Sequence, residues 1–493
     1  MADLSHMNEE KAGEMKKKNR GRFGHNADED EEGHTHYHGV DKAEQHIGVD
    51  QALEMFLGQI VPVRPVTVTL DEAWNRVLFQ DIISEIDIPK QARSTRDGFA
   101  IRLPGHAGAA APFSEFSIVG EVRIGAIPTI SLKDGQAALV ATGSYVPDGT
   151  SAVMMKEYAK VRDGNLLTIE REATAGENIL APGADISRGD TVLKAGTRLR
   201  PNHIALLAML GWGKVRVYRR PRVGFFSTGD ELMDVKEKGL ESSKKNRRSD
   251  KKKEGGGAKI YDSNRPFIKA ALQELGAEPC DLGIARDNFD EIRAKMLNGL
   301  RTCDALFLSA GSSVGERDYV GRAADSIKGV RMLVHGVAMR PSSPTGLATY
   351  QGKPFVLLPG FPTSAIVSFF VFGLPVISKL SGLSLGATEG GKKRVEALAA
   401  RLGVFYQTIS ATLLDEYHGK PGIKHFLRVR VTRDRTDGGE RYLARIVKPT
   451  EAYHSKWLAE ANGIAVIDED KVSAVMSGNK EVPVLLFGNV GQN

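Results

Sequence analysis

The stretch from residue 222 to residue 374 alternates short apolar segments with amphipathic ones, and this pattern limits the possible folds most strongly. Runs rich in Val, Leu and Phe are typical of buried strands, and apolar residues three or four positions apart are typical of helices. The predicted strands are 222–226, 278–284, 305–308 and 355–358. The predicted helices are 264–275, 289–300, 319–327 and 364–374. Strands that alternate with helices predict a parallel, doubly wound α/β sheet.

Short β-like segments flank this region on both sides. They lie at 116–119, 138–140 and 152–155 before it, and at 426–431, 444–447, 464–467 and 482–486 after it. Further amphipathic helices are predicted at 49–59, 69–81 and 201–210. A chain of 493 residues is long enough for about three domains. We expect a charged, disordered tail at 1–46, a linker region at 47–90 and 166–220, a small β-rich domain at 91–165, an α/β domain at 221–380 and a C-terminal β-domain at 390–493.

The net charge of the chain comes from one short segment. The whole sequence has 67 basic and 61 acidic residues, which gives +6, and residues 236–259 alone hold ten Lys or Arg and four Asp or Glu, also +6. The basic pI is therefore no argument for a nucleic-acid-binding protein. We interpret 236–259 as a solvated loop insertion in the α/β domain. The alternative is an electrostatic contact with RNA or an acidic partner.

The first 46 residues are polar and contain six of the twelve histidines. His34, His36 and His38 alternate, so in an extended chain they would share one side and bind Zn²⁺ or Ni²⁺ weakly. The chain begins without the apolar segment of a signal peptide. Its longest apolar stretch, 365–377, is short for a membrane span. Two cysteines, Cys280 and Cys303, are too few for a zinc cluster or a disulfide framework, and we expect a cytoplasmic protein with no membrane association.

Three polar loops follow predicted strands of the α/β domain, with the sequences STGDE at 227–231, SAGSSVG at 309–315 and LPGFP at 358–362. Ligands of doubly wound sheets bind at the carboxyl ends of the strands. SAGSSVG matches neither dinucleotide nor P-loop patterns, but its glycines and amide groups suit phosphate; a tight structural turn is the alternative. The candidate ligand-binding residues are Thr228, Gly229, Asp230, Ser309, Gly311, Ser312, Ser313, Gly315, Pro359, Gly360 and Ser364.

Acidic residues recur in and near these loops. They are Asp97, Asp185, Asp230, Glu231, Asp262 and Asp318. A single loop aspartate is usually a cap or turn residue. Several carboxylates beside a phosphate loop suit a hard cation such as Mg²⁺, which often bridges to a substrate phosphate.

Several ordered segments resemble the MoeA-type molybdopterin molybdenumtransferases, the family that includes the E domain of gephyrin. The resemblance runs from about residue 49 to residue 487. Its most specific segments are PRVGFFSTGDEL at 221–232, IYDSNRPFIKAALQELGAEPCDLGIARDN at 260–288 and SAGSSVGERDY at 309–319. DGFAIR at 97–102, ATGSYVPDG at 141–149 and GADISRGDTVLKAGTRL at 183–199 add to it.

This resemblance implies a homodimer, with 47–90 and 166–220 as its dimerisation region, whose α/β domain holds adenylylated molybdopterin. Molybdate, or the similar tungstate, enters the dithiolene with the assistance of Mg²⁺, and AMP is released. The family's acidic site residues fall on Asp97, Asp185, Glu231, Asp262 and Asp318, of which Glu231, Asp262 and Asp318 would hold the metal. The resemblance also implies hand-off of the substrate from a molybdopterin adenylyltransferase.

The sequence departs from the family pattern around the expected anion pocket. It has AGSSVG for GGVSVG, PSSP for PGKP at 341–344, PGFPTS for PGNPVS at 359–364, and Arg96 for the Met of MDG. We expect Arg340, Ser342, Ser343 and Ser364 to supply donors to the oxyanion, with Lys353 as the next candidate. The PSSP loop motivates a second hypothesis, a non-catalytic paralogue that binds the cofactor or acts as a scaffold.

Overall fold

A computed structural model describes residues 46–103, 109–110, 114–237, 259–310, 319–383, 406–436, 439–448, 454–469 and 479–492. All of these except His46 belong to one compact unit, Ile47–Asn493. Most of the predicted tail, most of the basic insertion and the loop at 311–318 lie outside the described residues.

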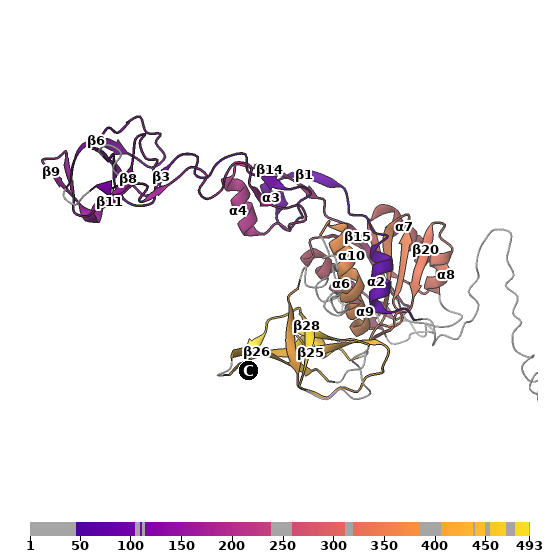
Figure 1. The fold of residues 1–493 in the computed structure, drawn as a ribbon. Helices are drawn as coiled ribbons and strands as arrows, with labels where there is room; N and C mark the ends of the chain where they lie inside the picture. Colours follow the sequence, from indigo (N-terminus) through magenta and orange to yellow (C-terminus); the bar gives the residue numbers. More distant parts are fainter. Residues whose placement is uncertain are drawn as a thin grey trace, which may run out of the picture. The chain divides into compact units, whose positions relative to one another are not determined.

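The small β-rich region contains a six-stranded sheet in the order β8-β4-β7-β6-β10-β9 (Figure 1). Its strands are β4 (Gly98–Ile101), β6 (Glu115–Val122), β7 (Gln136–Val140), β8 (Ala152–Met155), β9 (Ala159–Arg162) and β10 (Leu166–Ile169). The sheet therefore extends to residue 169, past the boundary expected at 165. The short helix η1 (Lys156–Tyr158) joins β8 to β9. Small two-stranded pairings surround this sheet and are formed by β3 (Arg93–Ser94) with β12 (Ile179–Leu180) and β5 (Ala109–Ala110) with β11 (Ala173–Thr174).

The prediction of a helix at 69–81 is wrong. Residues Pro65–Thr69 form β1, which pairs with β14 (Lys214–Tyr218), and only Leu70–Ala73 is helical, as α3. Asn75 adopts a positive φ of 63° and ends the helix, and its side-chain oxygen accepts a hydrogen bond of 2.6 Å from Arg198 Nε. Tertiary pairing overrides the local helical pattern here. The same region holds α4 (Pro201–Met209), as predicted, and the pair β2 (Ile82–Ile83) and β13 (Thr191–Leu193).

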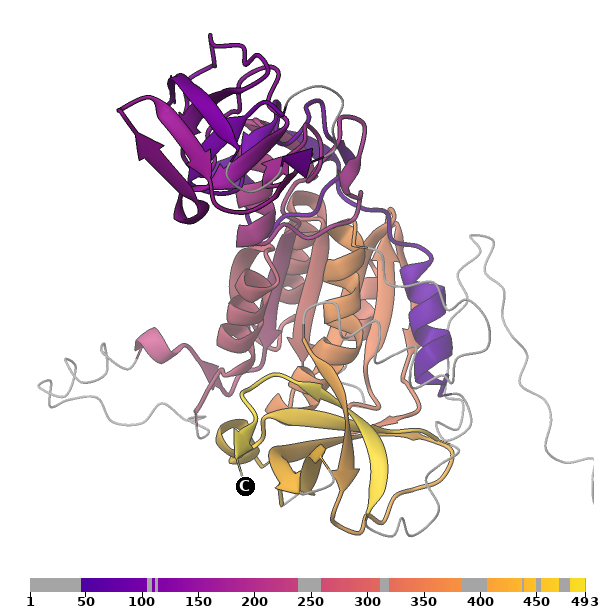
Figure 2. The same cartoon turned by 60° about the vertical axis from the view of Figure 1, so that its left-hand side comes forward.

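The α/β region contains a six-stranded sheet in the order β18-β15-β19-β23-β22-β20 (Figure 2). The strands are β15 (Arg222–Thr228), β18 (Glu278–Ala285), β19 (Ala305–Ala310), β20 (Val330–His335), β22 (Gly346–Tyr350) and β23 (Lys353–Pro359). The first four strands in that order, from β18 to β23, are parallel, as predicted. The antiparallel strands β22 and β20, which the sequence analysis missed, complete one edge, so the sheet is mixed.

Helices cover both faces of this sheet, which confirms the doubly wound arrangement. One apolar cluster joins one face to α2 (Val49–Leu57), α6 (Asn264–Glu274), α9 (Pro362–Ser368) and α10 (Leu374–Leu380). A second cluster joins the other face to α7 (Phe289–Thr302) and α8 (Tyr319–Asp325). The π-helical turn η3 (Phe369–Gly373) links α9 and α10. The continuous helix Pro362–Leu380 is apolar and long enough to cross a membrane, but 94% of its apolar window is buried, which is typical of a core helix.

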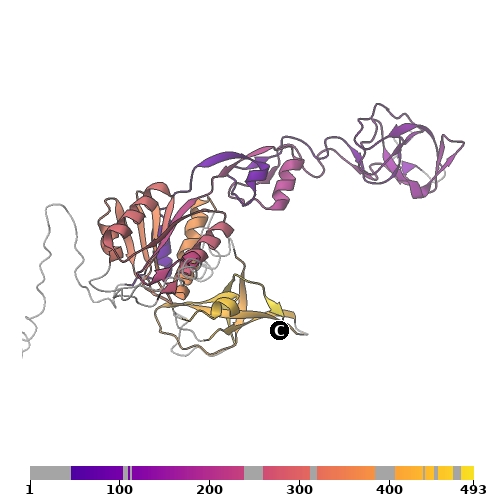
Figure 3. The ribbon, with the colours of Figure 1, turned by 180° about the vertical axis from the view of Figure 1, so that it is seen from behind.

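The C-terminal region is a β-domain, as predicted (Figure 3). Its strands are β24 (Thr408–Leu413), β25 (Lys424–Thr436), β26 (Gly439–Ile446), β27 (Gly463–Ile467), β28 (Lys480–Leu486) and β29 (Gly491–Gln492). The short strand β21 (Met339–Arg340) pairs with β25, and the short helix α12 (Trp457–Glu460) brings the Trp457 indole to Thr363, to whose hydroxyl it donates at 2.7 Å.

Candidate functional site

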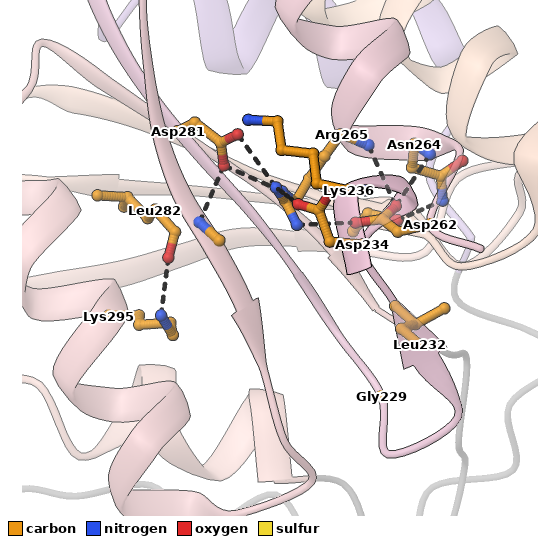
Figure 4. A network of polar contacts seen from close by, with 12 residues as sticks. Gly229, Leu232, Asp234, Lys236, Asp262, Asn264, Arg265, Asp281, Leu282 and Lys295 are labelled. Carbon is orange, nitrogen blue, oxygen red and sulfur yellow. Dashed lines mark hydrogen bonds and ion pairs between the residues drawn. The ribbon is translucent and has the colours of Figure 1, made fainter. Parts of the chain in front are cut away.

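Asp262 is a buried carboxylate at the start of α6, directly after β17 (Ile260–Tyr261). Its Oδ1 accepts two backbone hydrogen bonds, from Asn264 at 3.0 Å and from Arg265 at 3.2 Å (Figure 4). These bonds satisfy amide groups that the first turn of a helix leaves free. Its Oδ2 is buried and has no hydrogen-bond partner among the described residues. One oxygen of Asp262 therefore fixes the side chain, and the other keeps its hydrogen-bonding capacity in a buried position.

Arg265 lies among three carboxylates (Figure 4). Its Nε and one terminal nitrogen hold both oxygens of Asp281, at 3.0 and 3.1 Å, and that same terminal nitrogen lies 2.9 Å from Asp234 Oδ2. The other terminal nitrogen lies 3.6 Å from Asp262 Oδ2. One guanidinium thus faces three aspartates, and the charges of Lys236 and Lys269 also act on Asp234 and Asp281, respectively.

The hydrogen bonds of this cluster keep its outer carboxylates ionised. The backbone amide of Lys236, and then Arg265, hold the pKa of Asp234 below its usual value. Burial would raise the pKa of Asp281, but hydrogen bonds from Arg265 and the Gly283 amide outweigh it, and the pKa of Asp281 is lowered. Both groups therefore hold Arg265 in place at neutral pH.

Asn264 connects α6 to two of the three predicted loops. Its side-chain nitrogen donates to Ser309 Oγ at 2.7 Å, at the end of β19, and to the carbonyl oxygen of Gly360 at 2.8 Å. Its side-chain oxygen is buried without a hydrogen-bond partner among the described residues. Asn264 therefore orders the loop ends and presents a second available oxygen close in sequence to Asp262.

The TGDE loop lies at the end of β15, and the Arg286 side chain donates hydrogen bonds to its backbone. Thr228 is buried at the strand end, whereas Asp230 and Glu231 are exposed. Arg286 donates to the carbonyl oxygens of Gly229, Asp230 and Leu232, the last at 2.8 Å.

Gly229 has a φ of 152°, and a Cβ there would lie 2.6 Å from a carboxylate oxygen of Glu231. Glycine therefore lets the Glu231 side chain fold back over the loop. The loop continues into β16 (Leu232–Met233), which pairs with β17, and then into η2 (Val235–Glu237).

The loop after β23 contributes its backbone rather than its side chains. Pro359 ends the strand and accepts a hydrogen bond from Ser309 Oγ at 3.3 Å. Ser364 is buried in α9, and its carbonyl oxygen accepts the hydroxyl of Ser342 at 2.7 Å. Ser342 has a φ of 86° and is itself buried, so its hydroxyl is engaged within the fold. A direct role of Ser342 toward an oxyanion stays a prediction, as does that of Ser343.

Arg340 is exposed on β21, opposite His425 of β25. Burial lowers the pKa of His425, and the charge of Arg340 adds to this effect. Burial raises the pKa of Tyr417, while Arg340 opposes the increase. The charge of Arg340 thus acts on the C-terminal β-domain, and its role beside an oxyanion stays a prediction.

Lys353 is not an oxyanion ligand. It begins β23, at the opposite end of the strand from Pro359, and its amine donates to the carbonyl oxygen of Leu300 at 2.8 Å. It stabilises the C-terminal end of α7 instead.

Asp97 lies in the small β-rich region, directly before β4. Its Oδ1 accepts from the amide and the hydroxyl of Thr142, at 2.7 and 2.8 Å, and its Oδ2 lies 3.7 Å from Lys156 Nζ. The Thr142 amide, more than any other group, holds the pKa of Asp97 below its usual value. The following Gly98 allows close packing, since a Cβ there would lie 1.9 Å from the Met154 carbonyl oxygen. Asp185 is exposed, and its backbone amide donates to the carbonyl oxygen of Ile88.

The acidic residues predicted from the sequence form no metal-binding cluster among the described residues. No group of three His, Cys, Asp or Glu side chains able to hold a metal occurs within the described ranges. Asp318, which the sequence analysis added to Glu231 and Asp262, lies outside those ranges, as do Gly311, Ser312, Ser313 and Gly315. The unpartnered Oδ2 of Asp262 fits a cation ligand, and completion of that set stays a prediction.

Sequence reasoning missed Asn264, Arg265, Asp234, Asp281 and Arg286. The first two stood next to Asp262 in YDSNRP, where consecutive polar residues at the start of an apolar helix are a usable signal. Asp234 and Asp281 are separated from them in sequence and meet Arg265 only in the fold. Arg286 follows β18 and contacts the TGDE loop instead.

Three family models match the chain along most of its length. They are the MoeA N-terminal region (domain I and II) at residues 47–211, the probable molybdopterin binding domain at 224–379 and the MoeA C-terminal region (domain IV) at 410–487.

Curated relatives and solved structures agree with these matches. A molybdopterin molybdenumtransferase of Haemophilus influenzae is 32% identical over 73% of this chain and 86% of its own length. One of Staphylococcus aureus is 30% identical over 78% of this chain and 84% of its own. A crystal structure of a molybdopterin biosynthesis moeA protein from Pyrococcus horikoshii OT3 is 26% identical, covers 90% of this chain and all of its own, and has a TM-score of 0.69. Three consecutive domain matches in the family's order, with relatives at this identity and coverage, show that the chain belongs to the MoeA family.

Proposed function

We propose that this protein is a molybdopterin molybdenumtransferase that inserts molybdate or tungstate into adenylylated molybdopterin and releases AMP. The observation that carries the proposal is the buried Oδ2 of Asp262, which has no hydrogen-bond partner among the described residues. Asp262 lies two residues before Asn264, whose side-chain nitrogen donates to Ser309 at the end of β19 and to Gly360 after β23. Sites for ligands of doubly wound sheets lie at such strand ends. The curated relatives are named molybdopterin molybdenumtransferases, which supports the transferase part of the proposal.

The proposed reaction has two parts. The two dithiolene sulfur atoms replace two oxygen ligands of the metal oxyanion. These leave as two water molecules, which take up the two thiol protons and two protons from solvent. A water molecule then cleaves the phosphoanhydride bond to the adenylate, and AMP leaves. Amide groups of the glycine-containing loops would bind the phosphates, since backbone N–H groups at such loops favour anions.

We further propose that Mg²⁺ assists this cleavage. Bound to Asp262 Oδ2, with Glu231 and Asp318 as further ligands, Mg²⁺ would neutralise charge on the phosphate oxygens. Asp262 suits this role because its Oδ1 is fixed by two amides, so that Oδ2 has a defined direction. Asp97 would contact the substrate from the small β-rich region, where Thr142 holds its carboxylate in one orientation.

The test is a turnover assay with purified protein, adenylylated molybdopterin, Mg²⁺ and either molybdate or tungstate. We expect AMP release that requires the protein and an oxyanion. A folded protein that binds adenylylated molybdopterin without releasing AMP would instead support the non-catalytic paralogue that the PSSP loop suggests.

A further inference from the structure

Arg265 is oriented by two carboxylates, Asp281 and Asp234. Asp281 of β18 accepts hydrogen bonds from two of its nitrogen atoms. Asp234, in the loop after β16, accepts a hydrogen bond from one of these two nitrogens as well. Its third nitrogen is left 3.6 Å from Asp262 Oδ2, beyond an ordinary hydrogen bond but well within the range of an ion pair. The Arg265 side chain is only 9% exposed, and that of Asp262 3%.

We infer that Arg265 is a positioning residue for the reaction, which acts by holding Oδ2 of Asp262 in place. This inference rests on the proposed function. A buried carboxylate with an unpartnered oxygen is costly unless a nearby charge compensates it. At 3.6 Å Arg265 supplies that charge without consuming the hydrogen-bonding capacity of Oδ2. The oxygen therefore keeps its hydrogen-bonding capacity in a buried position.

The planar guanidinium is needed for this geometry. Arginine presents several donors in a fixed plane, so contacts to Asp281 on one side determine where its remaining nitrogen lies. A lysine has a single ammonium group and cannot contact Asp281, Asp234 and Asp262 in the same way. We therefore expect Arg265→Lys to keep the charge of the cluster but to lose part of the orientation, and Arg265→Gln to lose both.

The experiment is a double-mutant cycle in the full-length protein, read as AMP release at saturating and at limiting adenylylated molybdopterin. The variants are Arg265→Gln, Arg265→Lys, Asp262→Asn and the combinations with Asp262→Asn. Outer residues of a ligand site commonly change activity by about 10–100-fold. We expect Arg265→Gln to lower kcat at least ~10-fold with a KM within ~3-fold of the wild type, and Arg265→Lys to recover part of that loss.

A residue that acts through Asp262 has little left to do once the Asp262 charge is gone. In the Asp262→Asn background we therefore expect Arg265→Gln to change the residual rate by less than ~2-fold, because interacting residues give non-additive effects. An equal loss in both backgrounds would show that Arg265 acts on folding or on the substrate by another route, and would overturn the inference. Wild-type kcat in Arg265→Gln would overturn it as well.

Arg219→Gln is the matched control. Arg219 also donates hydrogen bonds to both oxygens of one partly buried carboxylate, that of Asp304. This pair lies near the start of β15, at the opposite end of the strand from the TGDE loop. We expect Arg219→Gln to lower the melting temperature and to leave kcat unchanged. If Arg265→Gln does not fold, the cycle is read with Arg265→Lys by the same criteria. Turnover by the wild type and by Arg219→Gln supports the proposed function whatever Arg265 does, and its absence in both would reject that function instead.

Discussion

Asp262 shows how one residue serves both the fold and the site. Its Oδ1 begins α6 by accepting two amides, and its Oδ2 has no hydrogen-bond partner among the described residues. Asparagine has nearly the same shape and can still accept both amides through its side-chain oxygen. The substitution therefore separates the structural role from the charge.

We predict that Asp262→Asn lowers AMP release at least ~10-fold, as is common for residues at a metal or phosphate site. The melting temperature should fall by less than ~3 °C, because the helix start keeps its acceptor. Asp290→Asn, the same change at an exposed residue in the first turn of α7, is the control and should alter neither quantity. Wild-type turnover by Asp262→Asn would remove this carboxylate from the chemistry.

The ion pair of Arg219 with Asp304 predicts a pH dependence of stability. Burial alone would raise the pKa of Asp304, but Arg219 and the Arg222 amide lower it from the ordinary value of 3.8. A carboxylate whose pKa is lower in the folded protein stabilises it above the unfolded pKa, and this contribution is lost as the pH falls through the folded pKa.

The melting temperature of Asp304→Asn should accordingly lie below that of the wild type at pH 7. The difference should shrink as the pH falls below about 4, where the unfolded carboxylate also becomes protonated. Melting curves of both proteins between pH 3 and pH 7 test this. A difference that stays constant over that range would mean that the Asp304 charge does not stabilise the folded protein.

Elements with a strong apolar period could be predicted from the sequence, and those set by distant pairing could not. The buried strand β15 and the helix α7 were found because their apolar residues follow a clear period. Residues 69–81 also had a helical pattern, but pairing of β1 with β14 and the left-handed Asn75 decided their structure. The same limit applies to the site. Asp262 was found by its motif, whereas Asp281 approaches Arg265 only through the packing of α6 beside β18.

The basic insertion is an element whose two ends are anchored by described contacts. Asp234 before it binds Arg265, and Lys259, its last residue, donates to the carbonyl oxygen of Asp230. These anchors do not depend on the residues between 238 and 256. Loop length adds only slowly to the free energy of closure, by about 0.6 kcal/mol for each doubling.

We therefore predict that a short Gly/Ser linker in place of residues 238–256 preserves both the melting temperature and the rate of AMP release. An insertion of scrambled sequence and equal charge is the control. A large loss with the neutral linker but not with the scrambled insertion would indicate that the charge of this segment takes part in substrate binding.

At the scale of the whole molecule, one buried lysine connects segments that lie far apart in the sequence. Lys424 of β25 is fully buried, and its amine lies 2.9 Å from Asp50 of α2 and 2.9 Å from Asp468, just after β27. Burial would lower the pKa of Lys424, but the two carboxylates raise it above its ordinary value. This contact ties the first helix of the compact unit to the C-terminal β-domain.

Removal of one member of a buried ion pair leaves uncompensated charge behind, at a cost of several kcal/mol. We predict that Lys424→Met lowers the free energy of unfolding by on the order of 3 kcal/mol, and that adding Asp468→Asn recovers part of the loss. Urea unfolding followed by the fluorescence of the buried Trp457 measures both effects. A loss below ~0.5 kcal/mol would show that the pair contributes little.

The most direct test of the account is the stoichiometry of a single turnover. Purified protein is mixed with adenylylated molybdopterin, Mg²⁺ and molybdate or tungstate, and AMP and metal retained on molybdopterin are measured in the same sample. We expect equal amounts of AMP and bound metal from the wild type, and formation of both at least ~10-fold more slowly by Asp262→Asn. AMP release that does not require the oxyanion, or a folded wild-type protein that forms neither product, would contradict it.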